Sequence, residues 1–302
     1  MNKRKTGLLS GAGLLFATIL WGSGFVAVKD SLDIIPPVYM IAIRFALAGI
    51  FLSAVFFKKL KSMTRSALRT GIILSFFLFL AYTFQTIGCV YTTAGKNAFL
   101  TTIYVILVPL IAWLFSKRGP GVHVFIAAAL AVAGIGLLSL GDDLSVNQGD
   151  ILTLVCGFWY AVHIVFIARF TQKHNEDPIT LTILQMLFCS VFAWILAPFY
   201  DGTFPVEAVT TPRPVLSLLY MAIFPSGIAF LLQNIGQKYL APSTAALLLS
   251  TESVFGALFA ALLLGESMNS RMILGCALLL LAVILSETKL AFLTRKHKRH
   301  SI

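Results

Sequence analysis

The feature that most constrains this chain is a succession of apolar runs, each about 20 residues long, separated by short polar segments. An α-helix of about that length spans the hydrocarbon core of a bilayer. Hydrophobic residues make up 58% of the 302 residues and charged residues only 12%, whereas a soluble domain carries about 25% charged residues. The runs continue almost to the end of the chain and leave no stretch for a soluble domain. The sequence therefore predicts an all-α integral membrane protein.

The apolar runs, and the Pro-rich and Gly-rich breaks between them, predict ten transmembrane helices. The first run follows three basic residues, as a secretion signal would, but it is longer than the roughly 7 to 15 apolar residues of a cleavable signal. We therefore expect it to be retained as a span. The predicted spans are residues 8–28, 38–57, 67–90, 94–115, 122–140, 150–170, 179–200, 215–235, 242–264 and 271–292.

The basic residues near the span ends predict the orientation, since loops rich in Lys and Arg stay in the cytoplasm. With the N-terminus inside, most basic residues, including those of the C-terminal tail, lie on the cytoplasmic side. The opposite side holds only Lys29, Lys96, Arg213 and Arg271. This distribution places both termini in the cytoplasm of a protein of the inner or plasma membrane. The net charge of +11 therefore reflects topology, and we expect no nucleic acid partner.

Segments of the two halves resemble each other. The pattern Gln-x-Ile-Gly-x-x-Tyr occurs at residues 85–91 and again at 233–239, and Trp21 corresponds to Trp159. Such a pattern rarely recurs by chance, so we expect a duplication into two five-helix repeats, residues 1–140 and 141–302. An odd number of spans inserts the second copy upside down. Inverted repeats are typical of secondary transporters, which bind substrate near the midplane between the halves.

The first predicted span contains the pair Trp21-Gly22, and three further short segments stand out, residues 104–109, 251–255 and 262–266. Together they resemble the EamA-type transporters of the drug/metabolite transporter superfamily, and this resemblance covers nearly the whole chain. The resemblance implies ten spans in two inverted halves, a central cavity, and export or exchange of metabolites, amino acids or toxic compounds. The chain departs from the family pattern at Ser253, where Pro is usual, and at Lys117-Arg118, where Gly-Glu is common.

Two charged residues within predicted spans are candidates for substrate binding or coupling, because ionised groups inside a bilayer usually face the bundle interior. Glu252 lies about ten residues into its span, near the midplane. It would bind a cationic group or couple transport to protons; alternatively it bonds a neighbouring helix backbone. Arg44 lies about two turns from the outer end of its span. It would either attract a carboxylate or phosphate or extend its guanidinium outward to the interface.

Four uncharged polar residues are further candidates. His163 lies deep in the sixth predicted span, where it would relay protons or pack as a satisfied core histidine. The repeat-related Gln85 and Gln233 would bond substrate or bridge helices. Asn97, beside Lys96, begins the fourth predicted span and would form part of an outer entry or serve the helix end.

Aromatic residues complete the candidate set. Trp21 and Trp159, as repeat partners, and Tyr82 and Tyr104 would form stacking walls of the cavity. The alternative for all four is ordinary packing or a place in the interfacial aromatic belt.

The sequence shows no sign of a cofactor, a metal site or a catalytic centre. The four cysteines stand singly in apolar runs, and neither a phosphate-binding loop nor an H-E-x-x-H motif occurs. We therefore expect a secondary transporter with a small-molecule substrate, a lipid environment and protons as a candidate coupling ion. The alternatives are a lipid-linked substrate flippase and, further off, a membrane-embedded lipid-modifying enzyme.

Overall fold

The computed structural model describes residues 3–115, 121–139 and 146–288, and each regular element in these ranges is a helix. Lys117-Arg118 and the basic C-terminal tail lie outside the described residues. The elements are α1 (Lys3–Ser31), α2 (Pro37–Val55), α3 (Phe57–Lys61), α4 (Arg65–Tyr91), α5 (Ala94–Thr101), α6 (Tyr104–Leu114), α7 (Val122–Ser139), α8 (Gln148–Ala168), η1 (Arg169–Lys173), α9 (Pro178–Tyr200), α10 (Glu207–Thr210), α11 (Pro212–Met221), η2 (Ala222–Ile228), α12 (Ala229–Tyr239), α13 (Pro242–Ser250), α14 (Glu252–Leu264) and α15 (Ser270–Thr288).

Eight helical segments within the described residues are long and apolar enough to cross a bilayer. They coincide with eight of the ten predicted spans and confirm the all-helical membrane architecture. The other two predicted spans fall on α7 and α15, which contain the shorter apolar stretches Phe125–Gly134 and Ser270–Ala282. The count of ten spans therefore stays a prediction.

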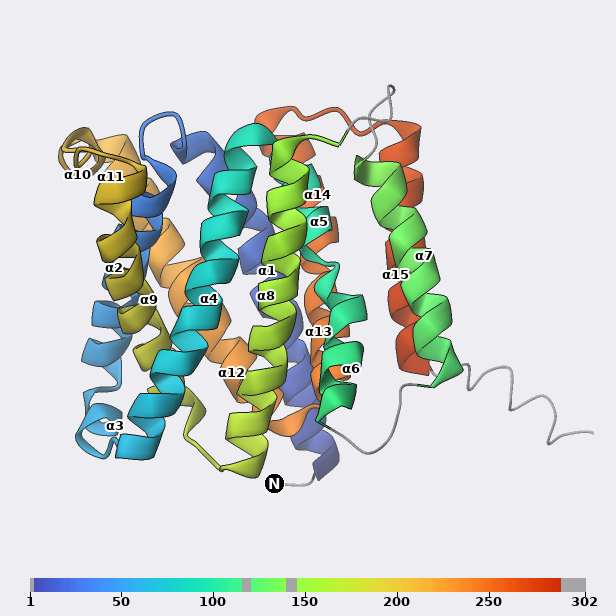
Figure 1. The fold of residues 1–302 in the computed structure, drawn as a ribbon, viewed down its shortest axis with the longest axis horizontal. Coiled ribbons are helices and arrows are strands. Elements are labelled where there is room, and N and C mark those ends of the chain that lie inside the picture. Colours follow the sequence, from blue (N-terminus) through green and yellow to red (C-terminus); the bar gives the residue numbers. More distant parts are fainter. Residues whose placement is uncertain (1–2, 116–120, 140–145, 289–302) are drawn as a thin grey trace, which may run out of the picture.

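The long helices run up and down through one bundle (Figure 1). The helix α1 climbs from the end where the N-terminus lies, α2 descends and α4 climbs again, whereas α8 descends and α9 climbs. The first helix of the second half thus runs opposite to the first helix of the first half.

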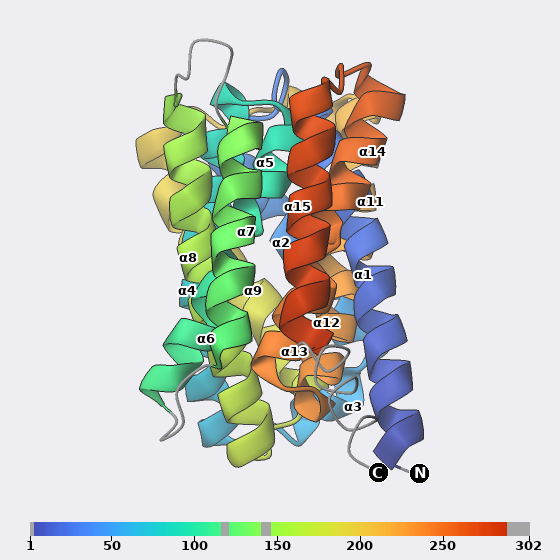
Figure 2. The ribbon, with the colours of Figure 1, turned by 90° about the vertical axis from the view of Figure 1, so that its right-hand side faces the viewer.

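Helices of one half pack mainly against helices of the other. The helix α2 packs along α9, and α7 packs along α15 at one side of the bundle (Figure 2). Two further contacts correspond to each other: α4 packs on α8, the first helix of the second half, and α12 packs on α1, the first helix of the first half.

Two of the membrane-spanning segments are broken near their middle. In Ala94–Leu114 the break falls between α5 and α6, at Thr102, and in Pro242–Leu264 it falls between α13 and α14, at Thr251. Each threonine hydroxyl donates to the carbonyl three residues earlier, at 2.7 Å. Such bonds compete with the helical ladder and favour a break.

The helices α1, α14 and α5 cross closely through small residues. A Cβ on Gly22 would lie 2.5 Å from the Cβ of Phe255, and a Cβ on Gly256 would lie 2.5 Å from the Cβ of Ala98. Only glycine fits at these two positions. The close crossings place α14 against α1 and α5 against α14.

Candidate functional site

A cavity lies in the middle of the bundle, where the two broken segments meet α1, α2, α4, α8 and α12. Its walls combine aromatic rings with a few polar side chains, as in small-molecule sites generally. The lining residues are Trp21, Gly24, Phe25, Val28, Arg44, Tyr82, Gln85, Asn97, Tyr104, Tyr160, Ile164, Pro225, Gln233, Leu249 and Glu252.

Glu252 and Tyr104 meet in this cavity. The Tyr104 hydroxyl donates to Glu252 Oε1 at 2.8 Å, and both side chains are buried. Tyr104 is the first residue of α6 and Glu252 the first residue of α14, so each directly follows a helix break. They are 148 residues apart, which is the offset between the repeated Gln-x-Ile-Gly-x-x-Tyr patterns. Equivalent positions of the two halves therefore touch at the centre of the molecule.

Arg44 points into the cavity and does not extend to the membrane surface. It is 2% exposed, and its Nε donates to Ser226 Oγ of η2 at 3.0 Å. Its guanidinium carbon lies 5.0 Å from the centre of the Tyr82 ring and 5.5 Å from that of Phe45. No carboxylate among the described residues forms an ion pair with it. A buried cation held by aromatic faces and one hydroxyl is suited to bind an anionic group.

Gln85 and Asn97 form a polar corner of the cavity. Gln85 donates to Thr101 Oγ1 at 3.2 Å and accepts from the Tyr160 hydroxyl at 3.4 Å. Asn97 Nδ2 donates to Thr153 Oγ1 at 2.8 Å and to the Gln85 carbonyl at 3.2 Å. Both amides therefore bridge helices as well as line the cavity.

Two amide oxygens at the cavity have no hydrogen-bond partner among the described residues. They are Asn97 Oδ1 and Gln233 Oε1, both buried. Because an unpaired buried acceptor is unfavourable, these atoms are suited to accept hydrogen bonds from a bound molecule. Together with Glu252 they supply acceptors for N–H or O–H groups.

The aromatic walls come from α1, α4, α6 and α8. Trp21 Nε1 donates to the Pro225 carbonyl at 2.7 Å, and its ring lies 5.1 Å from that of Phe230. The rings of Tyr82 and Tyr160 meet edge to face with centroids 5.7 Å apart. The indole and phenol groups are thereby held in fixed orientations around the cavity.

Two predicted site residues, Trp159 and His163, do not line the cavity. Trp159 is half-buried and stacks on Phe77, with ring centroids 6.0 Å apart. His163 is fully buried, and its Nε2 lies 2.6 Å from Gln185 Oε1 of α9. Trp159 thus packs between α8 and α4, and His163 belongs to a polar contact outside the cavity.

Their immediate neighbours, Tyr160 and Ile164, line the cavity in their place. Successive residues of an α-helix are turned by about 100°, so a shift of one position changes the face. Phe25 also lines the cavity and was not singled out from the sequence. Trp159 and His163 have the same four-residue spacing as Tyr160 and Ile164, so this spacing does not identify the cavity face of α8.

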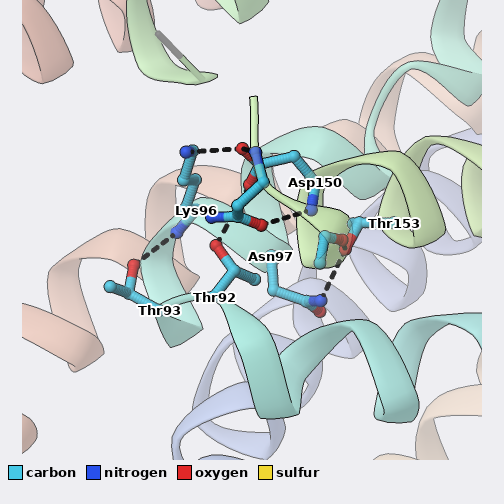
Figure 3. A network of polar contacts seen from close by, with 8 residues as sticks. Thr92, Thr93, Lys96, Asn97, Asp150 and Thr153 are labelled. Carbon is cyan, nitrogen blue, oxygen red and sulfur yellow. Dashed lines mark hydrogen bonds and ion pairs between the residues drawn. The ribbon is translucent and has the colours of Figure 1, made fainter. Parts of the chain in front are cut away.

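A buried ion pair joins the two halves beside the polar corner (Figure 3). Lys96 Nζ donates to Asp150 Oδ2 at 2.7 Å, and the Asp150 side chain is fully buried. Asp150 also accepts from the Thr92 hydroxyl and, in a capping box at the start of α8, from the Asn147 backbone N–H. The predicted topology has Lys96 on the outer side, but the sequence did not predict that Lys96 pairs with Asp150.

The described residues contain no group of three His, Cys, Asp or Glu side chains that could hold a metal ion. The residues that line the cavity offer hydrogen bonds, charge and aromatic stacking to a bound molecule.

Comparison with known proteins finds a matching family profile, several relatives and a solved structure of similar fold. The sequence profile of the EamA-like transporter family matches residues 9–140 and, a second time, residues 147–288. An "Uncharacterized transporter" of Archaeoglobus fulgidus is 33% identical over 92% of this chain and 85% of its own length. A "Probable amino-acid metabolite efflux pump" of Escherichia coli is 27% identical over 92% of this chain and 93% of its own. A crystal structure of an 18% identical protein superposes with a TM-score of 0.72, covering 94% of this chain and 97% of that one.

Proposed function

Because the chain belongs to the EamA-like transporter family, it is a membrane transporter of small metabolites and not an enzyme, and we propose that it is a secondary transporter working by alternating access. The central cavity is the substrate site in this proposal. The observation that carries it is the placement of Arg44 and Glu252, two buried groups of opposite kind, in one aromatic cavity between the halves.

The moving parts of the proposed mechanism are two inverted five-helix halves, residues 1–140 and 141–302, with α7 and α15 as the fifth and tenth spans. Three observations support this arrangement: the family profile matches twice, α1 and α8 run in opposite directions, and corresponding helices pair across the halves. Rocking of one half against the other would open the cavity to each side in turn.

The proposed substrate is a small zwitterion such as an amino acid. Arg44 would bind its carboxylate, and Glu252 with the free oxygens of Asn97 and Gln233 would bind its ammonium group. The name of the Escherichia coli relative, an amino-acid metabolite efflux pump, supports the same class. We expect the protein in the inner or plasma membrane. Both termini should lie in the cytoplasm, because most basic residues near the span ends fall on that side.

Flux from proteoliposomes tests the proposal. Vesicles loaded with a mixed metabolite panel are assayed by mass spectrometry, with and without an imposed pH gradient. We expect selective efflux of amino acids or related zwitterions, accelerated by the gradient if Glu252 carries a coupling proton. Protein-free vesicles and the Arg44→Gln variant are the controls, and the variant should lose transport of carboxylate-bearing solutes.

Release of none of the panel from folded protein would contradict the proposal. Movement of a labelled lipid-linked substrate between leaflets under the same conditions would instead support the flippase alternative.

A further inference from the structure

A second polar cluster lies outside the cavity, where α8, α9 and α12 meet. Its members are His163, Thr182, Gln185, Asn234 and Gln237, and each is 0% exposed. His163 Nε2 lies 2.6 Å from Gln185 Oε1, and Asn234 Nδ2 donates to Thr182 Oγ1 at 2.7 Å. We call these five residues the inner polar cluster.

Four atoms of the inner polar cluster have no hydrogen-bond partner among the described residues. They are His163 Nδ1, Gln185 Nε2, Asn234 Oδ1 and Gln237 Oε1. Helix-bridging polar residues in membranes normally satisfy their groups because lipid offers no replacement. Four unpaired atoms in one place are therefore more than helix bridging requires, and they point to a molecule that bonds there in some state of the protein.

The cluster continues the cavity toward the end of the bundle where α12 finishes. Ile164 and Gln233 line the cavity, and each is the chain neighbour of a cluster residue, His163 and Asn234. Gln237 Nε2 donates to the Ile164 carbonyl at 3.2 Å. Two residues beyond Gln237, Tyr239 is 55% exposed at the last position of α12.

Phe230 lies between residues of the cavity wall and a residue of the cluster. Its ring lies 5.1 Å from Trp21 and 5.8 Å from Tyr82, both in the cavity wall, and 6.2 Å from the His163 ring. The side chain is 1% exposed. The Phe230 ring thus contacts both the cavity wall and the inner polar cluster.

We propose that the inner polar cluster is the cytoplasmic leg of the substrate path and that Phe230 is the gate between this leg and the cavity. The inference rests on the proposed transport function and on the predicted orientation. When the inner side opens, water and the N–H or O–H groups of the substrate donate to His163 Nδ1, Asn234 Oδ1 and Gln237 Oε1. Gln185 Nε2 donates to an oxygen of water or of the substrate. The described cluster contains no Asp, Glu, Lys or Arg, so it offers hydrogen bonds without a fixed charge.

Single-cysteine accessibility tests the path. Asn234→Cys and Gln237→Cys are treated with a membrane-impermeant thiol reagent in right-side-out and inverted vesicles. The unsubstituted chain is the reference for the four native thiols, and Ile235→Cys on another face of α12 is the matched control. We expect modification of both cluster positions from the cytoplasmic side at least tenfold faster than of the control, and slower modification when substrate is added.

The proposed role of Phe230 as a gate predicts a second effect. Phe230→Ala should raise the rate of modification at Asn234→Cys from the outer side, whereas Phe224→Ala, on a partly exposed ring of η2, should not.

Transport by Gln237→Leu separates a path from a packing role without thiol chemistry. Gln237→Leu removes the unpaired Oε1 together with the Nε2 bond to the Ile164 carbonyl, so the melting temperature should change little. A path role lowers flux at least tenfold.

Unmodified cluster cysteines together with normal flux in Gln237→Leu would overturn the inference and leave the proposed transporter intact. Absence of flux in the unsubstituted protein would contradict the proposed function itself, and labelling from the cytoplasmic side would even then support a water-accessible leg.

Discussion

At the scale of single residues, the cavity holds two buried ionisable side chains, and neither forms an ion pair among the described residues. Arg44 is compensated by two aromatic faces and one hydroxyl, and Glu252 by one phenol. A buried charge without an opposite partner is unfavourable unless something binds to it. We therefore expect these two side chains to bind the substrate.

Replacement of Glu252 tests that expectation directly. Glu252→Gln keeps the size of the side chain and an oxygen for the Tyr104 hydroxyl but removes the charge and the titratable proton. Loss of a charge-assisted hydrogen bond of about 1.5–3 kcal/mol should lower flux by about 10–100-fold and abolish its pH dependence. Unchanged flux at every pH, measured in proteoliposomes, would exclude Glu252 from binding and coupling.

Asp177 gives a pH-dependent prediction outside the spans. Partial burial alone would raise the pKa of Asp177, but hydrogen bonds from the Thr180 N–H and hydroxyl and from Lys59 outweigh it and hold the pKa below 3.8. A depressed pKa stabilises the folded state above the unfolded value, and the benefit disappears as the pH falls through the folded value.

The measurement is thermal melting in detergent across pH 3 to 7. Asp177→Ala should lose about 1 kcal/mol at neutral pH, because the side chain caps α9 and its ion pair with Lys59 is half-exposed. Asp177→Asn keeps a capping oxygen and should lose less. A deficit of the Ala variant that stays constant down to pH 3 would contradict the role of the charge.

At the scale of elements, glycine decides how closely the broken segments approach α1. Gly22→Ala would place a methyl group 2.5 Å from Phe255 Cβ and 2.8 Å from the Phe255 backbone carbon. We expect a loss of about 1–3 kcal/mol from the strain of overpacking, seen as a lower melting temperature. Gly7→Ala in the same helix meets nothing within 4 Å and should be neutral or slightly stabilising. Equal effects of the two variants would show that the crossing is not tight.

The ion pair between α5 and α8 is a second decisive contact between elements. Lys96→Met should cost about 3 kcal/mol or more, because it leaves the fully buried Asp150 carboxylate without its cation. Adding Asp150→Asn should recover much of the loss, since the remaining pair is neutral. Thermal melting of the two single variants and the double variant measures the coupling, and purely additive losses would contradict a direct pair.

At the scale of the whole molecule, the two halves meet along corresponding helices. The contacts of α4 with α8 and of α12 with α1 have equivalent places in the two halves, as do the breaks at Thr102 and Thr251. The Tyr104–Glu252 bond lies where these equivalent positions coincide. A site at such a centre is reached from both sides by similar motions, which suits alternating access.

The proposed topology makes a prediction of its own. A fluorescent protein fused after Ile302 should be active, and alkaline phosphatase at the same place inactive, because an even number of spans returns the chain to the cytoplasm. Phosphatase fused after Tyr200, at the end of α9, should be active. External activity of the C-terminal fusion would overturn the ten-span arrangement.

The sequence alone determined the helical membrane class and the positions of eight spans. Each backbone N–H and C=O must be satisfied inside a bilayer, so helices of fixed length are imposed locally, along the chain. Arg44, Glu252, Tyr104 and Gln233 could also be recognised from the sequence, because each is a polar residue within an apolar run. The two copies of the Gln-x-Ile-Gly-x-x-Tyr pattern are 148 residues apart, which is also the separation of Tyr104 and Glu252.

Only the tertiary structure decided which face of each helix meets the cavity. Tyr160 and Ile164 line the cavity, whereas Trp159 and His163 do not. Arg44 is buried and points into the cavity and not toward the membrane interface, and Lys96 pairs with Asp150. The rotation of a helix about its axis is set by packing against helices far away in the sequence, and one residue changes it by about 100°. No local pattern in an almost uniformly apolar helix reports that angle, which is why the spans were predictable and the cavity wall was not.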